Sequence, residues 1–181
     1  MNLFNRLYNI FSDTHNERLI AAMTRYFSGD PKRIQHFIKV YSFAKTIAKI
    51  ELLDEYTADI LYTAAIVHDI GIKPAEEKYG KGVCGGDLQQ ELGTEPARNM
   101  LSELGYSKKC IERVCFLVAH HHTYTDVEGL DWQILLEADF LVNAYEDGLS
   151  KESVIKFRDK VFRTNSGIRL LNDMFGLEEK L

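Results

Sequence analysis

The chain has 181 residues with a formal net charge of −5, and 45% of its residues are hydrophobic and 27% charged. This length predicts a single domain spanning 1–181 with a sizeable core. No apolar run approaches the roughly 18 residues that span a bilayer, and the N-terminus lacks the layout of a secretory signal. The three cysteines, Cys84, Cys110 and Cys115, have no CxxC spacing, so we expect reduced thiols in a cytoplasmic protein without a membrane partner.

The acidic balance argues against extended nucleic acid as a partner, because such proteins carry a basic patch. It does not exclude a small phosphorylated substrate, since a bound metal ion would supply positive charge locally. The composition leaves open whether the chain forms a homo-oligomer.

Helical signals appear almost throughout the chain. Thr14 is a candidate cap for a first helix ending near Phe27. Asp30-Pro31 combines a capping carboxylate with a first-turn proline, which predicts a helix to about Leu53. A third helix from about Thr57 is apolar nearly all round in its second half, so we expect it to be the buried central helix.

Gly71 and Pro74 should end that helix, and the glycine-rich segment 73–86 is typical of a functional loop. The remaining predicted helices run from Asp87 to Leu104, from Ser107 to a histidine cluster, from Asp131 onward, from Ser150 to Phe162 and from Ile168 to Phe175. No strand alternation or sustained apolar heptad is present, which predicts an all-α globular helical bundle.

The most informative feature is His68-Asp69, which ends the apolar run Ala-Ala-Ile-Val and precedes Ile-Gly71. Burying an imidazole beside a carboxylate is costly unless both find a partner, and a divalent metal would satisfy both. Helical bundles build metal sites from inward residues of facing helices. Other helices offer further metal-competent groups: His36, the triplet His120-His121-His122, and Asp139 on a core face.

Each of these residues alone also fits a hydrogen-bonded core or surface position. Together they indicate a metal site of imidazole and carboxylate without thiolate. Such ligands favour a divalent transition metal: iron, manganese, cobalt, nickel or zinc.

The order His36, His68-Asp69, Asp139 on an all-α background resembles the HD-domain metal-dependent phosphohydrolases. The resemblance covers about residues 30–145, and the flanking helices are expected to belong to the same domain. It implies that His36, His68, Asp69 and Asp139 hold a metal ion.

The resemblance also implies that His120 and His121 supply ligands where a second ion binds. Members with two metals often have a further histidine in the preceding segment, which here reads Gln89-Gln90-Glu91-Leu92-Gly93. Either Glu91 substitutes as an oxygen ligand or the second site is absent, so one or two ions remain open. A Gly-Tyr-Pro triplet is missing after the histidines, which counts against the cyclic-dinucleotide phosphodiesterase branch.

The function implied is hydrolysis of a phosphomonoester or phosphodiester in a nucleotide or another small phosphorylated metabolite. Asp69 would orient a water molecule or accept its proton, and His120 or His121 would bind the phosphoryl group or protonate the leaving oxygen. Lys73 would neutralise phosphate charge. Helical phase places His121 inward with His120 beside it, whereas His122 begins a turn and should matter less.

Some alternatives stay open. Glu76 and Glu77 are other candidate bases, and the stretch 163–167 either offers backbone N–H groups to an anion or is simply capped by Ser166. A non-catalytic metal- or nucleotide-sensing module and a di-iron oxygenase of the HD type remain competing functions.

Overall fold

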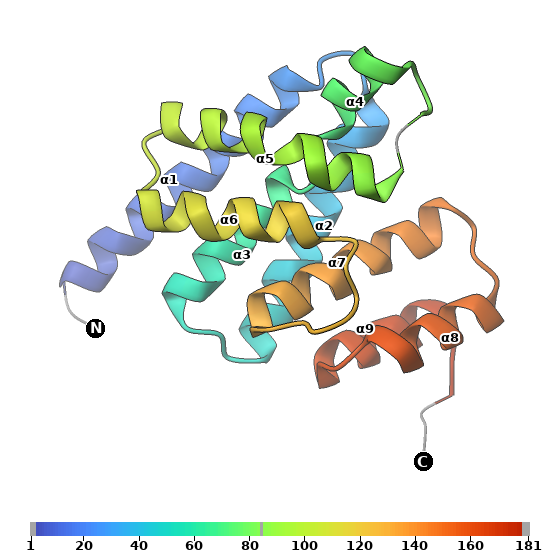
Figure 1. Cartoon of the computed structure of the whole chain (residues 1–181). Helices are drawn as coiled ribbons and strands as arrows, with labels where there is room; N and C mark the ends of the chain where they lie inside the picture. The colour runs from blue at the N-terminus through green and yellow to red at the C-terminus, as the bar shows by residue number, and fades with distance from the viewer. Residues whose placement is uncertain (1–2, 84, 179–181) are drawn as a thin grey trace.

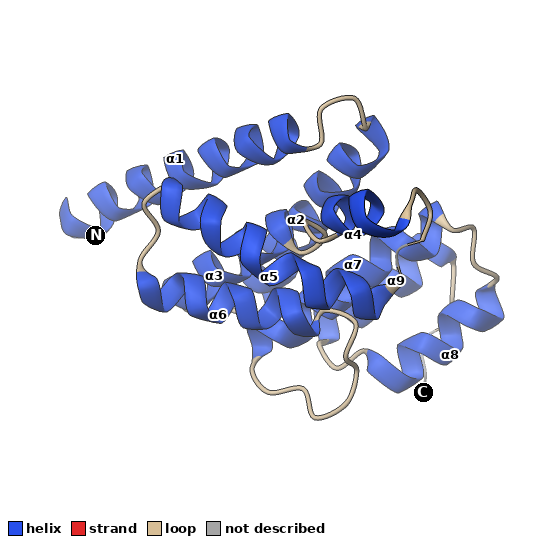
Figure 2. Ribbon diagram, turned by 45° about the horizontal axis from the view of Figure 1, so that its top comes forward, coloured by secondary structure: helices blue, strands red, loops and turns tan. Residues whose placement is uncertain are grey.

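The computed structural model describes residues 3–83 and 85–178, and every regular element in those ranges is an α-helix (Figures 1 and 2). This confirms the predicted all-α class. None of the described helices is long and apolar enough to cross a membrane. In chain order the helices are α1 (Leu3–Tyr26), α2 (Pro31–Ile50), α3 (Glu55–Val67), α4 (Ile72–Tyr79), α5 (Gly86–Glu103), α6 (Lys108–His120), α7 (Leu130–Glu146), α8 (Lys151–Val161) and α9 (Asn165–Phe175).

Several helix starts have the side-chain caps that the sequence predicts. The Asp30 carboxylate accepts a hydrogen bond from the Arg33 amide at 3.1 Å, and Pro31 follows at the first helical position, where no N–H is needed. Ser107 caps α6 and Ser150 caps α8 in the same way. These bonds satisfy amide groups that would otherwise lack partners at the first turn.

Two helices form the centre of the bundle. Nearly all of α3 from Ile60 to Val67 is buried, as is α7 from Asp131 to Val142. α2 packs against both of them, α6 packs against α3, and α5 lies along α6 (Figure 1). The start of α2, the ends of α3 and α6 and the middle of α7 can therefore bring polar side chains to one buried point.

The structure corrects three predicted boundaries. α1 begins at Leu3, so Thr14 lies inside the helix and not at its start. The expected loop 73–86 contains α4, because Pro74 falls in its first turn, where the amide it lacks would have no helical partner. Asp131 does not cap α7, since its carboxylate accepts two hydrogen bonds from Arg113 at 2.8 and 2.7 Å. Cys84 lies outside the described residues.

The turn after α3 is packed directly against the backbone of α5. A Cβ atom on Gly71 would lie 2.2 Å from the carbonyl oxygen of Gln89 and 2.8 Å from the amide nitrogen of Gly93. Only glycine permits this approach. The contact fixes α5 over the His68-Asp69 turn and determines which residues of α5 meet the histidines.

Candidate metal centre

The residues predicted from the sequence as primary metal ligands converge from separate helices. His36 lies in the second turn of α2, His68 caps the end of α3 with Asp69 directly after it, and Asp139 lies in the middle of α7. His68 is fully buried, and the side chains of His36 and Asp139 are 8% and 6% exposed. We call His36, His68, Asp69 and Asp139 the primary cluster.

The donor atoms of the primary cluster lie at nearly equal separations. His36 Nε2 is 3.3 Å from His68 Nε2 and 3.2 Å from Asp139 Oδ1, and His68 Nε2 is 3.4 Å from the same oxygen. Asp69 Oδ2 is 3.5 Å from His36 Nε2 and 3.6 Å from His68 Nε2.

Ligands at about 2.1 Å from one ion lie roughly 3.0–3.4 Å apart at octahedral and tetrahedral angles. The spacings in the primary cluster are close to this range, so these residues fit a divalent cation. His36, His68 and Asp69 also satisfy the distance requirement for a shared ion.

The hydrogen bonds of His36, His68 and His121 favour the tautomer that presents Nε2 to a metal ion. Each uses Nδ1 in a hydrogen bond away from the cluster: His68 to the carbonyl of Ala65 at 2.9 Å, and His121 to the carbonyl of Val118 at 2.7 Å. His36 uses Nδ1 toward Glu146 at 3.0 Å. When Nδ1 carries the proton, the lone pair is on Nε2, which is the atom facing the cluster.

A second group of donors shares Asp69 with the primary cluster. Asp69, His121 and His122 place ligand atoms within 4.8 Å of one another, and we call these three the second cluster. His121 is fully buried, yet its Nε2 has no hydrogen-bond partner and lies 3.6 Å from Asp69 Oδ1. A buried imidazole nitrogen without a partner is costly, and a cation there would remove that cost.

The positions of His120 and His122 reverse the expectation from helical phase. The His120 ring stacks on Phe116 with centroids 4.2 Å apart and meets Trp132 edge-on, away from both clusters. α6 ends at His120 and the chain turns at His121, so the phase of 100° per residue no longer applies. The turn instead brings the ring of His122 against His121, with centroids 4.0 Å apart.

Glu91 and Lys73 are not brought to the clusters by any described contact. Glu91 is exposed on α5. The ammonium of Lys73 donates to the carbonyl of Tyr26 at 3.1 Å and lies 4.7 Å from the centre of the Tyr26 ring. Lys73 thus binds the last carbonyl of α1, where a cation also interacts favourably with the helix dipole.

The residues of α5 that form hydrogen bonds with the histidine cluster are glutamines. Gln89 Oε1 accepts a hydrogen bond from His122 Nε2 at 2.8 Å, and Gln90 Oε1 accepts one from the His122 amide at 2.9 Å. The sequence of this segment shows that it lacks histidine but does not predict these contacts. The packing of Gly71 on α5 produces these contacts, and no local sequence pattern predicts that packing.

The carboxylates of the primary cluster favour positive charge on its histidines. Burial lowers the pKa of His68, but Asp69 and Asp139 more than offset this and raise it to about 9. Burial also raises the pKa of Asp69 and Asp139, and the adjacent histidines outweigh it, so both remain well below the usual range. A metal ion must therefore displace protons from the histidines when it binds.

His122 behaves in the opposite way. Burial, with a smaller contribution from His121, lowers the pKa of His122 to about 4. The ring is thus neutral at pH 7, and because its Nε2 faces Gln89 the lone pair lies on Nδ1.

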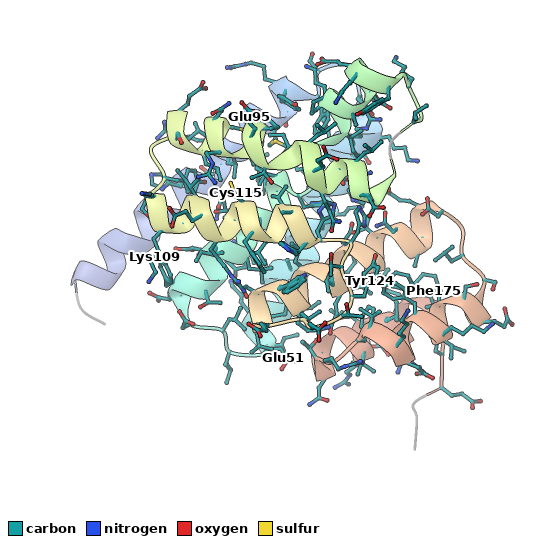
Figure 3. The ribbon with its side chains drawn as sticks, viewed as in Figure 1. Glu51, Glu95, Lys109, Cys115, Tyr124 and Phe175 are labelled. Atoms are coloured by element: carbon teal, nitrogen blue, oxygen red, sulfur yellow. The ribbon has the colours of Figure 1, made fainter. Side chains whose placement is uncertain are left out.

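Most amides of the stretch 163–167 already have acceptors within the protein. The amides of Arg163 and Thr164 donate to Glu137 Oε1 at 2.7 and 3.0 Å. The Ser166 amide donates a hydrogen bond to the Glu51 carboxylate at 2.9 Å. Glu51 is labelled near α9 in Figure 3. The α9 cap is Thr164 and not Ser166, so internal carboxylates occupy this site.

Comparison with known proteins gives the family. The model of the HD domain matches residues 33–158, which is more than half of the chain, and the chain belongs to the HD-domain family. The resemblance to the HD-domain family inferred from the sequence is thereby confirmed.

Solved structures share the fold. A crystal structure of a predicted HD superfamily hydrolase from an uncultured Thermotogales bacterium is 22% identical, with a TM-score of 0.63 over 88% of this chain and 84% of that one. Selenomethionine YpgQ from Bacillus subtilis is 15% identical, with a TM-score of 0.64 over 91% and 88%. Another YpgQ structure is 16% identical, with a TM-score of 0.59 over 92% and 90%. Curated proteins gave no match.

Proposed function

We propose that this protein is a metal-dependent phosphohydrolase that acts on a nucleotide or another small phosphorylated metabolite. The observation that supports it most directly is the sharing of Asp69 by two donor clusters. Its Oδ2 faces the histidines of the primary cluster, and its Oδ1 faces His121. Family membership supports hydrolysis, and the net charge of −5 favours a small substrate over an extended polyanion.

His36, His68, Asp69 and Asp139 would hold the first ion, and Asp69, His121 and His122 a second. Oxygen and imidazole donors suit manganese, iron, cobalt, nickel or zinc. A bound ion would lower the pKa of a water molecule and neutralise charge on a phosphoryl group.

Substrate would approach from the side of Asp69 and His122. The Asp69 side chain is 18% exposed, whereas His36 and Asp139 are 8% and 6% exposed, and His122 is also partly exposed. Asp69, through Oδ1, would then orient a water molecule or accept its proton. His122 is neutral at pH 7 and donates Nε2–H to Gln89, so the lone pair on Nδ1 would be available to the second ion.

Tyr124 is close enough to Asp139 to feel its charge. It lies on the connection between α6 and α7 (Figure 3) and packs edge-to-face on Phe157, with centroids 5.1 Å apart. Burial, assisted by the charge of Asp139, raises the pKa of Tyr124 to about 12. The hydroxyl therefore keeps its proton at neutral pH and can donate it in a hydrogen bond.

The direct test is metal analysis of anaerobically purified protein, combined with a phosphate- and pyrophosphate-release screen over nucleotides and sugar phosphates. We expect one or two ions per chain and turnover of at least one substrate, lost in Asp69→Asn. Stoichiometric metal without turnover would favour a sensing module. Two irons with a redox-dependent absorption band would favour an oxygenase, and either result would overturn the proposal.

A further inference from the structure

Glu146 contacts the primary cluster from outside it. It is the last residue of α7, two helical turns after Asp139, and its side chain is only 12% exposed. Its Oε2 lies 3.0 Å from His36 Nδ1. Its Oε1 accepts a hydrogen bond from Lys39, one turn further along α2. Both carboxylate oxygens of Glu146 are thus bound to α2.

The Nδ1 hydrogen bond of His36 differs from those of His68 and His121, the other two histidines whose Nε2 faces the donor clusters. His68 and His121 donate Nδ1–H to backbone carbonyls of their own helices, so their orientation comes with the helix. The partner of His36 is a side chain 110 residues away in sequence. The orientation of the His36 ring therefore depends on a side chain, which a substitution can remove.

The hydrogen bond also determines the chemistry of the ring. A carboxylate accepting from Nδ1–H holds the proton on that nitrogen, leaves the lone pair on Nε2, and makes the imidazole a more basic ligand. Glu146 contacts Nδ1 of His36, whereas Asp139 lies at Nε2, the nitrogen that faces the primary cluster. Glu146 is therefore not placed to bind the same ion as His36. It acts on the site only through His36.

We propose that Glu146 is a positioning residue for the metal centre, which orients His36 and fixes its tautomer while Lys39 fixes the carboxylate. This inference rests on the proposed function, in that it takes His36 to be a metal ligand. The hydrogen bond from His36 on α2 to Glu146 on α7 would then influence metal affinity, although neither Glu146 nor Lys39 touches the ion.

The experiment compares dissociation constants for Mn²⁺, measured by titration calorimetry on the full chain. Glu146→Ala should weaken binding about 10–100-fold, the range for loss of such a partner. Glu146→Gln keeps an acceptor oxygen and should lose less than about tenfold. The control Asp147→Asn removes a charge from the next, exposed position and should change affinity by no more than about twofold. Cobalt-loaded protein should show a shifted absorption band in Glu146→Ala only.

The comparison with His36→Ala separates this inference from the proposed function. If Glu146→Ala binds like wild type while His36→Ala loses at least about tenfold, the positioning role is wrong and the metal centre stands. If His36→Ala also binds like wild type, the metal centre itself is wrong. Equal losses in Glu146→Gln and Glu146→Ala would overturn positioning through hydrogen-bond acceptance. Should Glu146→Ala fail to fold, Glu146→Leu, which fills the space without an acceptor, takes its place.

Discussion

The metal-free protein should become less stable as the pH rises from 6.5 to about 9. Folding raises the pKa of His68 from 6.5 to about 9 because Asp69 and Asp139 outweigh the effect of burial. A group with a raised pKa in the folded state contributes stability that is fully present below its unfolded pKa and is lost as the pH passes its folded pKa. His36, whose pKa is also raised, acts in the same direction.

The size of the effect follows from the shift at His68. The difference between 6.5 and about 9 corresponds to about 3 kcal/mol, at roughly 1.4 kcal/mol per unit. His122 has the opposite sign, because its pKa falls to about 4, but its contribution is lost only as the pH drops below 6.5. The window above pH 6.5 therefore reports on the primary cluster.

Metal binding should reverse the trend. Ligand histidines must be deprotonated, so metal affinity and the stabilisation that metal confers should rise with pH over this window. Urea denaturation of chelator-treated and Mn²⁺-loaded protein at both ends of the window measures the two slopes. Asp69→Asn removes a charge that raises the pKa of His68, so its metal-free slope should be flatter. A metal-free stability that is constant or increases with pH would refute this account of the cluster.

Three further predictions concern single side chains. Asp139→Ala should weaken metal binding by at least about tenfold, or 1.4 kcal/mol, measured by calorimetry; unchanged affinity would remove Asp139 from the site. His122→Ala should lower kcat by at least about a hundredfold, whereas His120→Ala, whose ring packs on aromatic neighbours, should retain most activity; the reverse ranking in steady-state assays would contradict the structure. Gly71→Ala should destabilise the fold by about 1–3 kcal/mol or more in urea titrations, and Gly85→Ala, which has open space at Cβ, should not. Equal stability of these two variants would argue against the close contact with α5.

The sequence was sufficient to predict most helices because their signals are local. Caps such as Asp30 and Ser107 act on amides three residues away, and apolar periodicity reports which face is buried. The boundaries that were wrong depended on competing partners. Asp131 looks like a cap but binds Arg113, which is far from it in sequence, and no window around Asp131 contains that information.

The primary cluster could be anticipated because its members are chemically unusual where they occur. A carboxylate on the core face of α7, or at the end of apolar α3, has few explanations other than a strong partner. His122 and Glu146 gave no such signal. His122 reaches the second cluster only through the turn after α6, and Glu146 resembles any acidic residue at a helix end until α2 is packed against it.

α7 presents carboxylates to two different parts of the protein. Asp139 enters the primary cluster, while Glu137, two residues earlier and so on the other side of the helix, accepts the amides of Arg163 and Thr164. Those amides have a side chain, not a backbone carbonyl, as acceptor. Their hydrogen exchange should therefore respond to any rotation of α7. We therefore expect exchange of these two amides, just before α9, to report remotely on how firmly Asp139 is held.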